Sequence, residues 1–324
     1  MCTAVSYKTQ DHYFGRNMDY EYSYEERITI TPRNYEFRFR KAGTLKKHYA
    51  MIGTAYVVSG YPLYYEGVNE KGLAMAGLNF PGNAVYYEAI PGKDNIAPFE
   101  FIPWVLSQCD DIKDTKELLE KINLVNISFS RELPLSPLHW IISDSNTSIV
   151  VETTEDGMKI YDNATGVLTN NPPFPYHMYN LTNYMGLTRN TPEASFSGKL
   201  ELRPYSRGMG TIGLPGDLSS SGRFVKAVFT KENSVSGSGE MESVSQFFHI
   251  LEAVGQQRGL VKQGAEEYEI TIYSCCCNTN KGIYYYKTYD SQVIRGINMY
   301  HENLDGHTLI SYPMLNETYI EMQN

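Results

Sequence analysis

The order of strand-like and helix-like segments restricts the folds open to this chain more than any other feature. Apolar alternation or continuous apolar runs predict early strands, in residues 3–7, 12–16, 27–31, 35–39, 61–68 and 73–80. Two helices follow, over 98–108 and from 114, and then strands at 140–143, 148–153 and 158–161. Helices over 221–231 and 240–255 precede a last hairpin of 268–274 with 282–288. Because strands and helices come in blocks, a parallel doubly wound sheet is disfavoured, and we expect an α+β protein with helices on antiparallel sheets.

Composition and charge exclude several classes of protein. Hydrophobic residues make up 42% of the 324 residues and charged residues 20%, which is too apolar and too weakly charged for a disordered chain. The 28 Lys and Arg stand against 37 Asp and Glu, and this net charge of −9 excludes the basic footprint that nucleic acid requires. No apolar run approaches membrane-spanning length, and residues 1–8 lack the basic start and apolar stretch of a signal peptide. We expect one domain over residues 1–324, no membrane partner and a cytoplasmic location.

The motifs for cofactors and metals are absent or lie in the wrong context. Gly208–Gly213 matches G-x-G-x-x-G, but no buried strand leads into it and no helix opens on it, which favours a glycine-rich loop. Cys275, Cys276 and Cys277 are adjacent, so in a strand they point to alternating faces and fit packed thiols better than metal ligands. The seven His are scattered, with no H-E-x-x-H pair. We expect neither metal nor cofactor.

Cys2 is the candidate nucleophile. If an aminopeptidase removes Met1, which it does when the next residue is small, Cys2 carries both a thiol and a free α-amine with a reference pKa of about 7.7–8.0. A thiol beside its own base is an activated nucleophile, whereas the alternative is an ordinary core cysteine in a first strand. Arg16 and Asp19 lie on the strand expected to pair with the Cys2 strand, so a cation and a carboxylate come close to the first residues. This constellation favours the nucleophile.

Tyrosine is unusually common, at 27 residues, and it clusters at 20/22/24, 61/64/65 and 284/285/286. Tyrosine supplies rigid amphipathic surface. Two interpretations stay open: the clusters line strands and subunit contacts, which is favoured for most of them, or some of them form the wall of a pocket for a large apolar ligand.

Five short motifs in order resemble the choloylglycine hydrolases, the bile salt hydrolases and penicillin V acylases of the N-terminal nucleophile superfamily. They are MCTA at 1–4, FGRNMD at 14–19, GLNFPGN at 77–83, LTNNP at 168–172 and GLPGDLSS at 213–220 with Arg223-Phe224. The resemblance spans essentially the whole chain. It implies a four-layer αββα fold with two stacked antiparallel sheets, consistent with the α+β class. Gly222, where many relatives have Ser, and the cysteine triplet, where a pair is usual, depart from the family pattern.

The resemblance also implies the roles of six residues. Cys2 is the nucleophile, and Arg16 and Asp19 position and polarise it. Asn170 and the backbone N–H of Asn79 form the oxyanion hole, and Arg223 is the second active-site arginine. Such a fixed amide donor stabilises the developing oxyanion by about 3–4 kcal/mol.

The implied reaction is hydrolysis of the amide bond of glycine- or taurine-conjugated bile salts through a thioester on Cys2. Asn79 in GLNF favours a bile salt hydrolase, because penicillin V acylases commonly have Tyr there. The alternatives are a penicillin V acylase, an N-acyl homoserine lactone acylase, or a non-catalytic binding protein that retains the fold. An apolar pocket is expected for the steroid, with candidate wall residues Met18, Tyr20, Ala55, Phe129 and Leu135. The family resemblance further implies a homotetramer.

Overall fold

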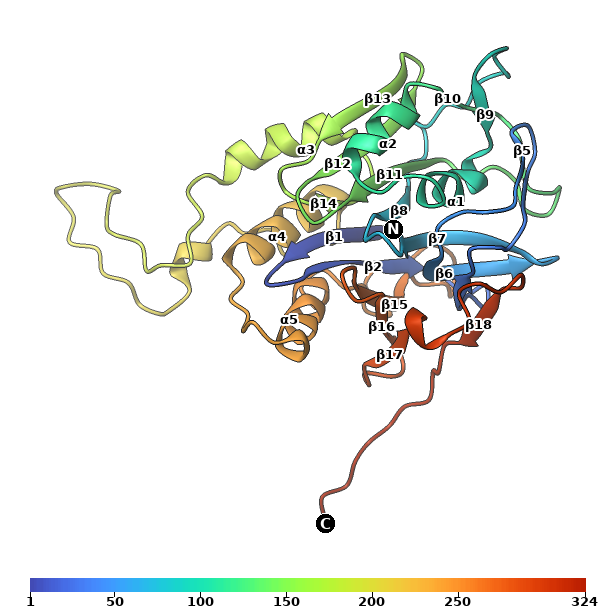
Figure 1. Ribbon diagram of the computed structural model, residues 1–324. Helices are drawn as coiled ribbons and strands as arrows, with labels where there is room; N and C mark the ends of the chain where they lie inside the picture. The colour runs from blue at the N-terminus through green and yellow to red at the C-terminus, as the bar shows by residue number, and fades with distance from the viewer.

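Two antiparallel sheets organise the protein in the computed structural model, which describes residues 1–324 (Figure 1). The smaller sheet has six strands in the order β14-β1-β2-β15-β16-β17. Their bounds are β1 Cys2–Lys8, β2 His12–Tyr20, β14 Val167–Leu168, β15 Ile270–Asn278, β16 Ile283–Thr288 and β17 Arg295–Asn298. The chain therefore begins in the middle of a sheet, with β1 between β14 and β2.

The larger sheet has eight strands in the order β13-β12-β11-β8-β7-β6-β3-β18. Their bounds are β3 Arg27–Thr31, β6 Met51–Val58, β7 Tyr61–Asn69, β8 Ala74–Asn79, β11 Leu138–Ser143, β12 Ser148–Thr154, β13 Gly157–Asp162 and β18 Ile310–Pro313. Two small pairs lie outside both sheets, β4 (Phe37–Phe39) with β5 (Gly43–Leu45), and β9 (Asp94–Ile96) with β10 (Ile122–Leu124).

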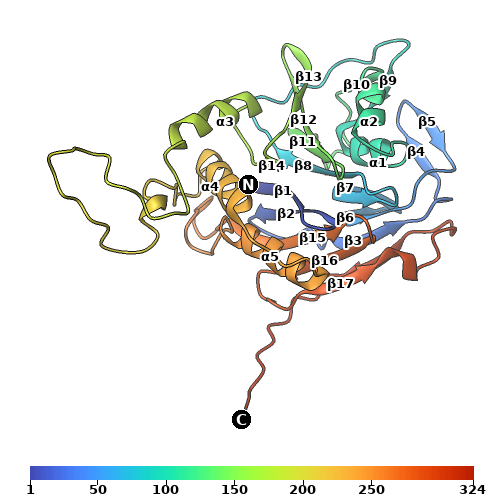
Figure 2. The ribbon, with the colours of Figure 1, turned by 60° about the vertical axis from the view of Figure 1, so that its left-hand side comes forward.

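Helices cover the outer faces, so the layers run α, β, β, α (Figure 2). On the six-stranded sheet lie α4 (Ser220–Asn233) and α5 (Glu240–Glu252). On the other side are α1 (Phe101–Leu106), which packs on β7 and β8, and α2 (Ile112–Leu119). The fifth helix, α3 (Phe174–Asn180), lies beside α4. The expected four-layer αββα fold is confirmed.

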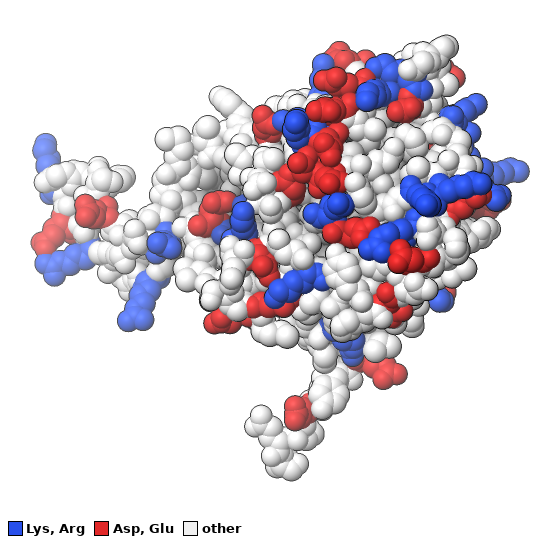
Figure 3. Space-filling view, viewed as in Figure 1, with Lys and Arg blue, Asp and Glu red and all other residues white.

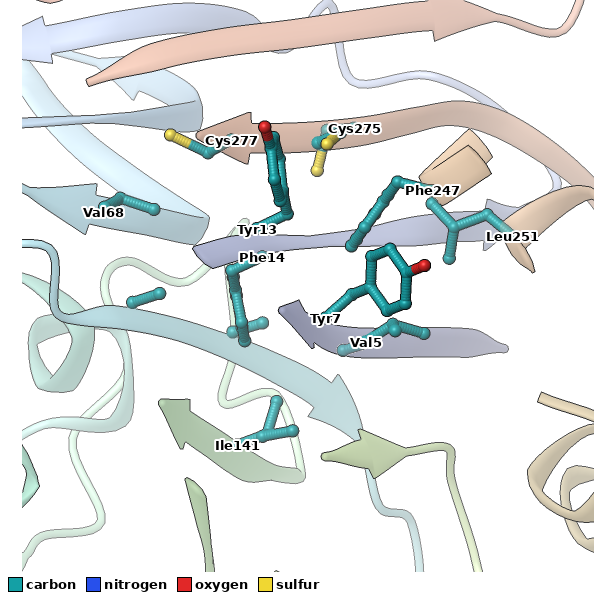
Figure 4. Close-up of a cluster of buried hydrophobic side chains, with 14 of the residues drawn as sticks. Val5, Tyr7, Tyr13, Phe14, Val68, Ile141, Phe247, Leu251, Cys275 and Cys277 are labelled. Carbon is teal, nitrogen blue, oxygen red and sulfur yellow. The ribbon is translucent and has the colours of Figure 1, made fainter. Parts of the chain in front are cut away.

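Two apolar cores hold these layers together. The first joins the facing sides of the two sheets and the underside of α4 and α5; Figure 4 shows part of it, with Val5 and Phe14 from the first hairpin and Phe247 and Leu251 from α5. The second lies between the eight-stranded sheet and α1 and α2. Strands covered on both sides need apolar residues at successive positions, which explains continuous runs such as Ala74–Leu78.

The structure corrects several element boundaries. The helix expected over 98–108 is a 3₁₀ turn at Pro98–Glu100 followed by α1. The helix expected from 114 begins at Ile112, because the Asp111 side chain accepts a hydrogen bond from the backbone N–H of Asp114 and caps it. The helix α3 is absent from the sequence interpretation because its start is proline-rich, although proline fits the first turn of a helix.

The surface agrees with the charge argument. Basic and acidic side chains are interspersed on the face in Figure 3, and no continuous basic patch covers it. No helix is long and apolar enough to cross a membrane.

Candidate active site

The first hairpin carries three of the six candidate residues. β1 and β2 pair antiparallel, with Cys2 opposite Met18 and Ala4 opposite Arg16, as the sequence predicted. Cys2, Arg16 and Asp19 are all buried, with 4%, 1% and 0% of their surface exposed. Full burial of a charged pair next to a thiol requires compensating partners, and the structure supplies them.

Arg16 is fixed from three directions between the sheets. Its Nη1 donates to the backbone oxygen of Gly77 at 2.7 Å and to that of Tyr65 at 3.3 Å, and it lies 3.9 Å from a carboxylate oxygen of Glu66. Burial opposes its charge, but Cys2, Tyr273 and Glu66 outweigh this and raise its pKa. Arg16 is therefore a permanent cation beside Cys2.

Glu66, the counter-ion of Arg16, was not identified from the sequence. The hydroxyls of Tyr273 and Tyr284 donate to its two carboxylate oxygens at 2.8 and 2.6 Å. Glu66 lies on β7 of the eight-stranded sheet, whereas Arg16 and the two tyrosines lie on the six-stranded sheet. The contacts of Glu66 therefore join the two sheets. No local pattern in the sequence marks such a contact.

Asp19 is buried among opposite charges. One of its carboxylate oxygens accepts a hydrogen bond from the Thr271 hydroxyl at 2.6 Å, and the other has no partner. Burial raises the pKa of Asp19, against the lowering effect of Arg223, the chain N-terminus, Thr271 and Arg16. The amine of Met1 donates to the Asp19 backbone oxygen at 2.8 Å and also contacts the carboxylate of Glu269.

Asn170 and Arg223 hold the main chain of Cys2 from behind. The Oδ1 of Asn170 accepts from the Cys2 backbone N–H at 2.8 Å and from Arg223 Nη2 at 2.9 Å. Because both partners are donors, the side-chain NH₂ of Asn170 must be on its other side, where it donates to the Asn79 backbone oxygen at 2.8 Å. Arg223 also donates to the Cys2 backbone oxygen at 2.6 Å and to the Thr3 hydroxyl at 2.7 Å.

A cavity of about 600 Å³ opens above this cluster. Cys2, Arg16, Asp19 and Asn79 line it, whereas Asn170 and Arg223 do not. Of its 28 lining residues, 17 are hydrophobic, so it suits a mainly apolar ligand. The thiol is thus accessible from one side and enclosed by charged and amide groups on the other.

Four of the five candidate wall residues line the cavity: Met18, Tyr20, Phe129 and Leu135. Ala55 does not. Its side chain is fully buried in the core between the eight-stranded sheet and α1 and α2. Side chains along β6 alternate without a break, so Ala55 shares the face of Met51 in that core, and the next residue, Tyr56, lies on the other face and lines the cavity instead.

The tyrosine clusters divide between the two interpretations. Six tyrosines line the cavity: Tyr20, Tyr22, Tyr24, Tyr56, Tyr64 and Tyr65. The hydroxyls of Tyr20, Tyr22 and Tyr24 form a chain, with Tyr24 3.0 Å from Tyr22 and 3.5 Å from Tyr20. By contrast, the cluster at 284–286 belongs to the core between the sheets. Of these six, only Tyr20 was named as a wall candidate, although all but Tyr56 belong to clusters visible in the sequence.

The cysteine triplet is packed inside the fold. Cys275, Cys276 and Cys277 lie on β15, all at most 1% exposed, and burial raises the pKa of each thiol. Packed thiols were the favoured interpretation. No group of three or more His, Cys, Asp or Glu side chains is arranged to hold a metal ion.

A buried thiol near the N-terminus, with one arginine beside it, a second arginine and an amide behind it and a mainly apolar cavity in front, fits a hydrolase that uses a cysteine nucleophile. The family model for linear amide C–N hydrolases of the choloylglycine hydrolase family matches residues 2–312. The chain belongs to this family.

Several curated proteins and solved structures are similar to this chain over most of its length. The bile salt hydrolase/transferase of Lactiplantibacillus plantarum is 56% identical over 98% of both chains. That of Clostridium perfringens is 39% identical over 96% of both. A crystal structure of a mutant conjugated bile acid hydrolase from Clostridium perfringens superposes with a TM-score of 0.92 over the full length of both chains, at 38% identity. The penicillin V acylase of Agrobacterium tumefaciens, at a TM-score of 0.76 and 17% identity, shares the fold.

Proposed function

We propose that this enzyme hydrolyses the amide bond of glycine- or taurine-conjugated bile salts, with Cys2 as nucleophile. The observation that carries the proposal is the position of the Cys2 thiol, at the floor of a mainly apolar cavity and beside the buried cation Arg16. The bile salt hydrolases among its relatives support the substrate class. The steroid body of a bile salt requires an apolar cavity wall, and its amide group requires a few polar side chains at one end of the cavity.

The first step requires removal of Met1, which converts the Cys2 backbone nitrogen into an α-amine. In the structure this nitrogen donates a hydrogen bond to Asn170 Oδ1, so the amine is already in position when removal of Met1 creates it. The amine takes the proton of the Cys2 thiol, and Arg16 and Arg223 stabilise the resulting negative charge. Sγ then attacks the amide carbon and forms the new C–S bond.

The oxyanion that develops accepts from the Asn79 backbone N–H and from the second hydrogen of the Asn170 side-chain NH₂, whose first hydrogen bonds the Asn79 backbone oxygen. The C–N bond breaks as the α-amine returns the proton to the leaving nitrogen, so glycine or taurine departs and a thioester remains. Water then adds to the thioester carbon, with the amine again accepting the proton, and the bile acid leaves as Sγ is released. The Asp19 carboxylate interacts electrostatically with Arg223 and with the N-terminal end of the chain, and from there it orients the Cys2 amine.

The decisive experiment is incubation of the purified enzyme with glycocholate and taurocholate, followed by assay of free amino acid. Penicillin V and an N-acyl homoserine lactone serve as parallel substrates. Release of glycine or taurine at a kcat/KM well above that for phenoxyacetate or acyl-chain release is the expected result. The reverse order would establish one of the two alternative acylases.

A non-catalytic binding protein is a rival from a different class. It requires either a retained Met1 or an unreactive Cys2. Intact mass determines whether Met1 is removed, and iodoacetamide labelling with peptide mapping determines whether Cys2 reacts. We expect a mature chain that starts at Cys2, with Cys2 labelled and residues 275–277 unlabelled.

We also propose a cytoplasmic, single-domain enzyme that assembles as a homotetramer. The segment between α3 and α4 projects far from the body (Figure 1) and exposes large apolar side chains, among them Met185, Phe196 and Tyr205, each 83% exposed. Contiguous exposed apolar surface of this kind marks protein interfaces. Light scattering coupled to gel filtration should give four chains per particle; a monomer would contradict the assembly.

A further inference from the structure

Three buried titratable side chains lie directly behind the segment that carries Asn170, and the proposed reaction does not use them. They are His139 on β11, Glu152 on β12 and His177 on α3, all with 0% of their surface exposed. We propose that they are positioning residues, which hold the backbone of Thr169 and Asn170 so that the Asn170 amide stays aimed at the oxyanion. This inference rests on the proposed function, because its readout is amide hydrolysis.

His177 holds the backbone oxygen of Asn170 itself. Its Nε2 lies 2.9 Å from that oxygen. A carbonyl only accepts hydrogen bonds, so Nε2 carries a proton. Burial lowers the pKa of His177, which keeps the ring neutral and in this single tautomer. The ring also stacks on Phe224 of α4, with centroids 4.7 Å apart, so its orientation is fixed on two sides.

His139 holds the preceding carbonyl in the same way. Its Nε2 lies 2.9 Å from the Thr169 backbone oxygen, and its other nitrogen lies 3.1 Å from a carboxylate oxygen of Glu152. The ring stacks on Phe80, with centroids 4.3 Å apart and an interplanar angle of 4°. Phe80 follows Asn79 directly, so one imidazole supports both halves of the proposed oxyanion hole.

Glu152 connects the two histidine-bearing elements. The same carboxylate oxygen that faces His139 accepts the backbone N–H of Phe174 at 2.9 Å, at the start of α3. The position of α3 determines where His177 lies. Glu152 thus orients His139, and His139 orients a main-chain carbonyl. Supporting residues commonly fix the groups of an active site in this way.

The geometry of this support explains why a small shift matters. Asn170 makes three side-chain hydrogen bonds, to Cys2, Arg223 and Asn79, and all three depend on its backbone position. Loss of one carbonyl anchor lets the backbone move without removing any group that touches substrate. A misplacement of about 1 Å at a reacting centre costs about 100-fold in rate.

The test replaces His177 with Phe, which keeps the ring and its stacking but removes the donor. The matched control is His12→Phe. His12 is also buried, on β2, and its ring nitrogens bond Ser6 and Thr279 at 2.9 Å, but it contacts no part of Asn170. We expect kcat for taurocholate to fall about 10- to 100-fold in H177F with KM within about twofold, and kcat in H12F to stay within about twofold of the parent. Equal kcat losses in the two variants would overturn the inference.

Conservative replacements give the same comparison if the Phe variants do not fold. In His177→Gln the amide reaches the position of Nε2 and donates to the Asn170 oxygen, so activity should stay within about threefold of the parent. The shorter His177→Asn does not reach that oxygen and should lose activity as H177F does. Equal activity of the Gln and Asn variants would contradict the role. Failure of the proposed function shows separately, as absence of glycine and taurine release by the unmodified enzyme.

Discussion

The two ends of the first hairpin bury polar side chains to the same degree but differ in charge. At the open end, Arg16 and Asp19 are charged groups within a few residues of Cys2, and a cavity exposes them to ligand. At the turn end, His12 is bonded to the hydroxyls of Ser6 and Thr279, and burial lowers its pKa to about 4, so its buried ring is neutral at pH 7. The buried side chain at the turn end has both ring nitrogens bonded, whereas at the open end one carboxylate oxygen of Asp19 has no partner. Buried charge is costly, and this hairpin keeps it where the reaction develops charge.

Replacement of one side chain at each end of β1 should separate the two regions most strongly. Cys2→Ala removes the proposed nucleophile and should reduce taurocholate hydrolysis by about 10⁴-fold or more. Ser6→Ala, on the same strand, removes a hydroxyl that bonds His12 and Ser143 and should leave kcat within about twofold. Free taurine is the readout. Turnover by the Cys2 variant would contradict the mechanism, and a large loss in the Ser6 variant would contradict the division between the ends.

Asp19→Asn tests whether the charge at the open end serves the reaction at the expense of stability. We expect kcat to fall about 100- to 1,000-fold, because a neutral amide no longer orients the α-amine electrostatically. Burial raises the pKa of Asp19 above its unfolded value, so the stability that protonation gives is present at low pH and lost once pH exceeds the folded pKa. Because burial disfavours the ionised carboxylate in the folded protein, the melting temperature of the Asn variant should hold or rise. A lower melting temperature would show that Asp19 stabilises the fold.

Two threonines, Thr271 partly buried and Thr279 buried, offer a milder comparison. The Thr271 hydroxyl donates to Asp19, and the Thr279 hydroxyl bonds His12. Each hydroxyl makes one further hydrogen bond, Thr271 with the Gln256 backbone N–H and Thr279 with the His12 backbone oxygen, so valine at either position loses two, which costs about 2 kcal/mol in the free energy of unfolding. We expect Thr271→Val to lower kcat about tenfold and Thr279→Val to leave it within about twofold. Denaturant unfolding and steady-state kinetics on both variants measure this directly; similar kcat values would mean that Asp19 needs no help from Thr271.

The sequence predicted the open end of the hairpin well, because strand pairing is local. A short turn at residues 9–11 forces Arg16 and Asp19 toward the first residues, and the observed pairing confirms that geometry. The packed cysteine triplet followed from strand alternation in the same way. Residues 79, 170 and 223 come from three distant segments, and only resemblance to a family connected them with Cys2.

The wall of the cavity was predictable only in part. Ala55 fails because it lies on the face of β6 that packs in the core with Met51, and alternation along one strand does not tell which face meets a helix layer and which meets a cavity. Glu66 was missed because its partners, Tyr273 and Tyr284, lie on the other sheet. Sheet stacking therefore determines both the counter-ion of Arg16 and the faces that line the cavity. The roles of the six candidate residues remain predictions until the variants above are measured.

The smallest expected effect belongs to the turn end, and it concerns stability alone. His12 has a pKa of about 4 in the folded protein against 6.5 as its ordinary value, chiefly through burial, with Lys8 and Lys231 lowering it and Asp144 opposing them. Below pH 6.5 the unfolded chain binds a proton at His12 that the folded chain does not, so stability is full above pH 6.5 and is lost as pH falls toward 4. Between pH 7 and pH 5 this one group accounts for about 2 kcal/mol of lost stability.

In His12→Gln that contribution is absent, so the difference in unfolding free energy between pH 7 and pH 5 should shrink by about the same 2 kcal/mol, with kcat unaffected. Denaturant titrations of parent and variant at both pH values measure the difference; an unchanged pH dependence would mean that His12 is charged in the folded protein, and the turn end would then resemble the open end after all.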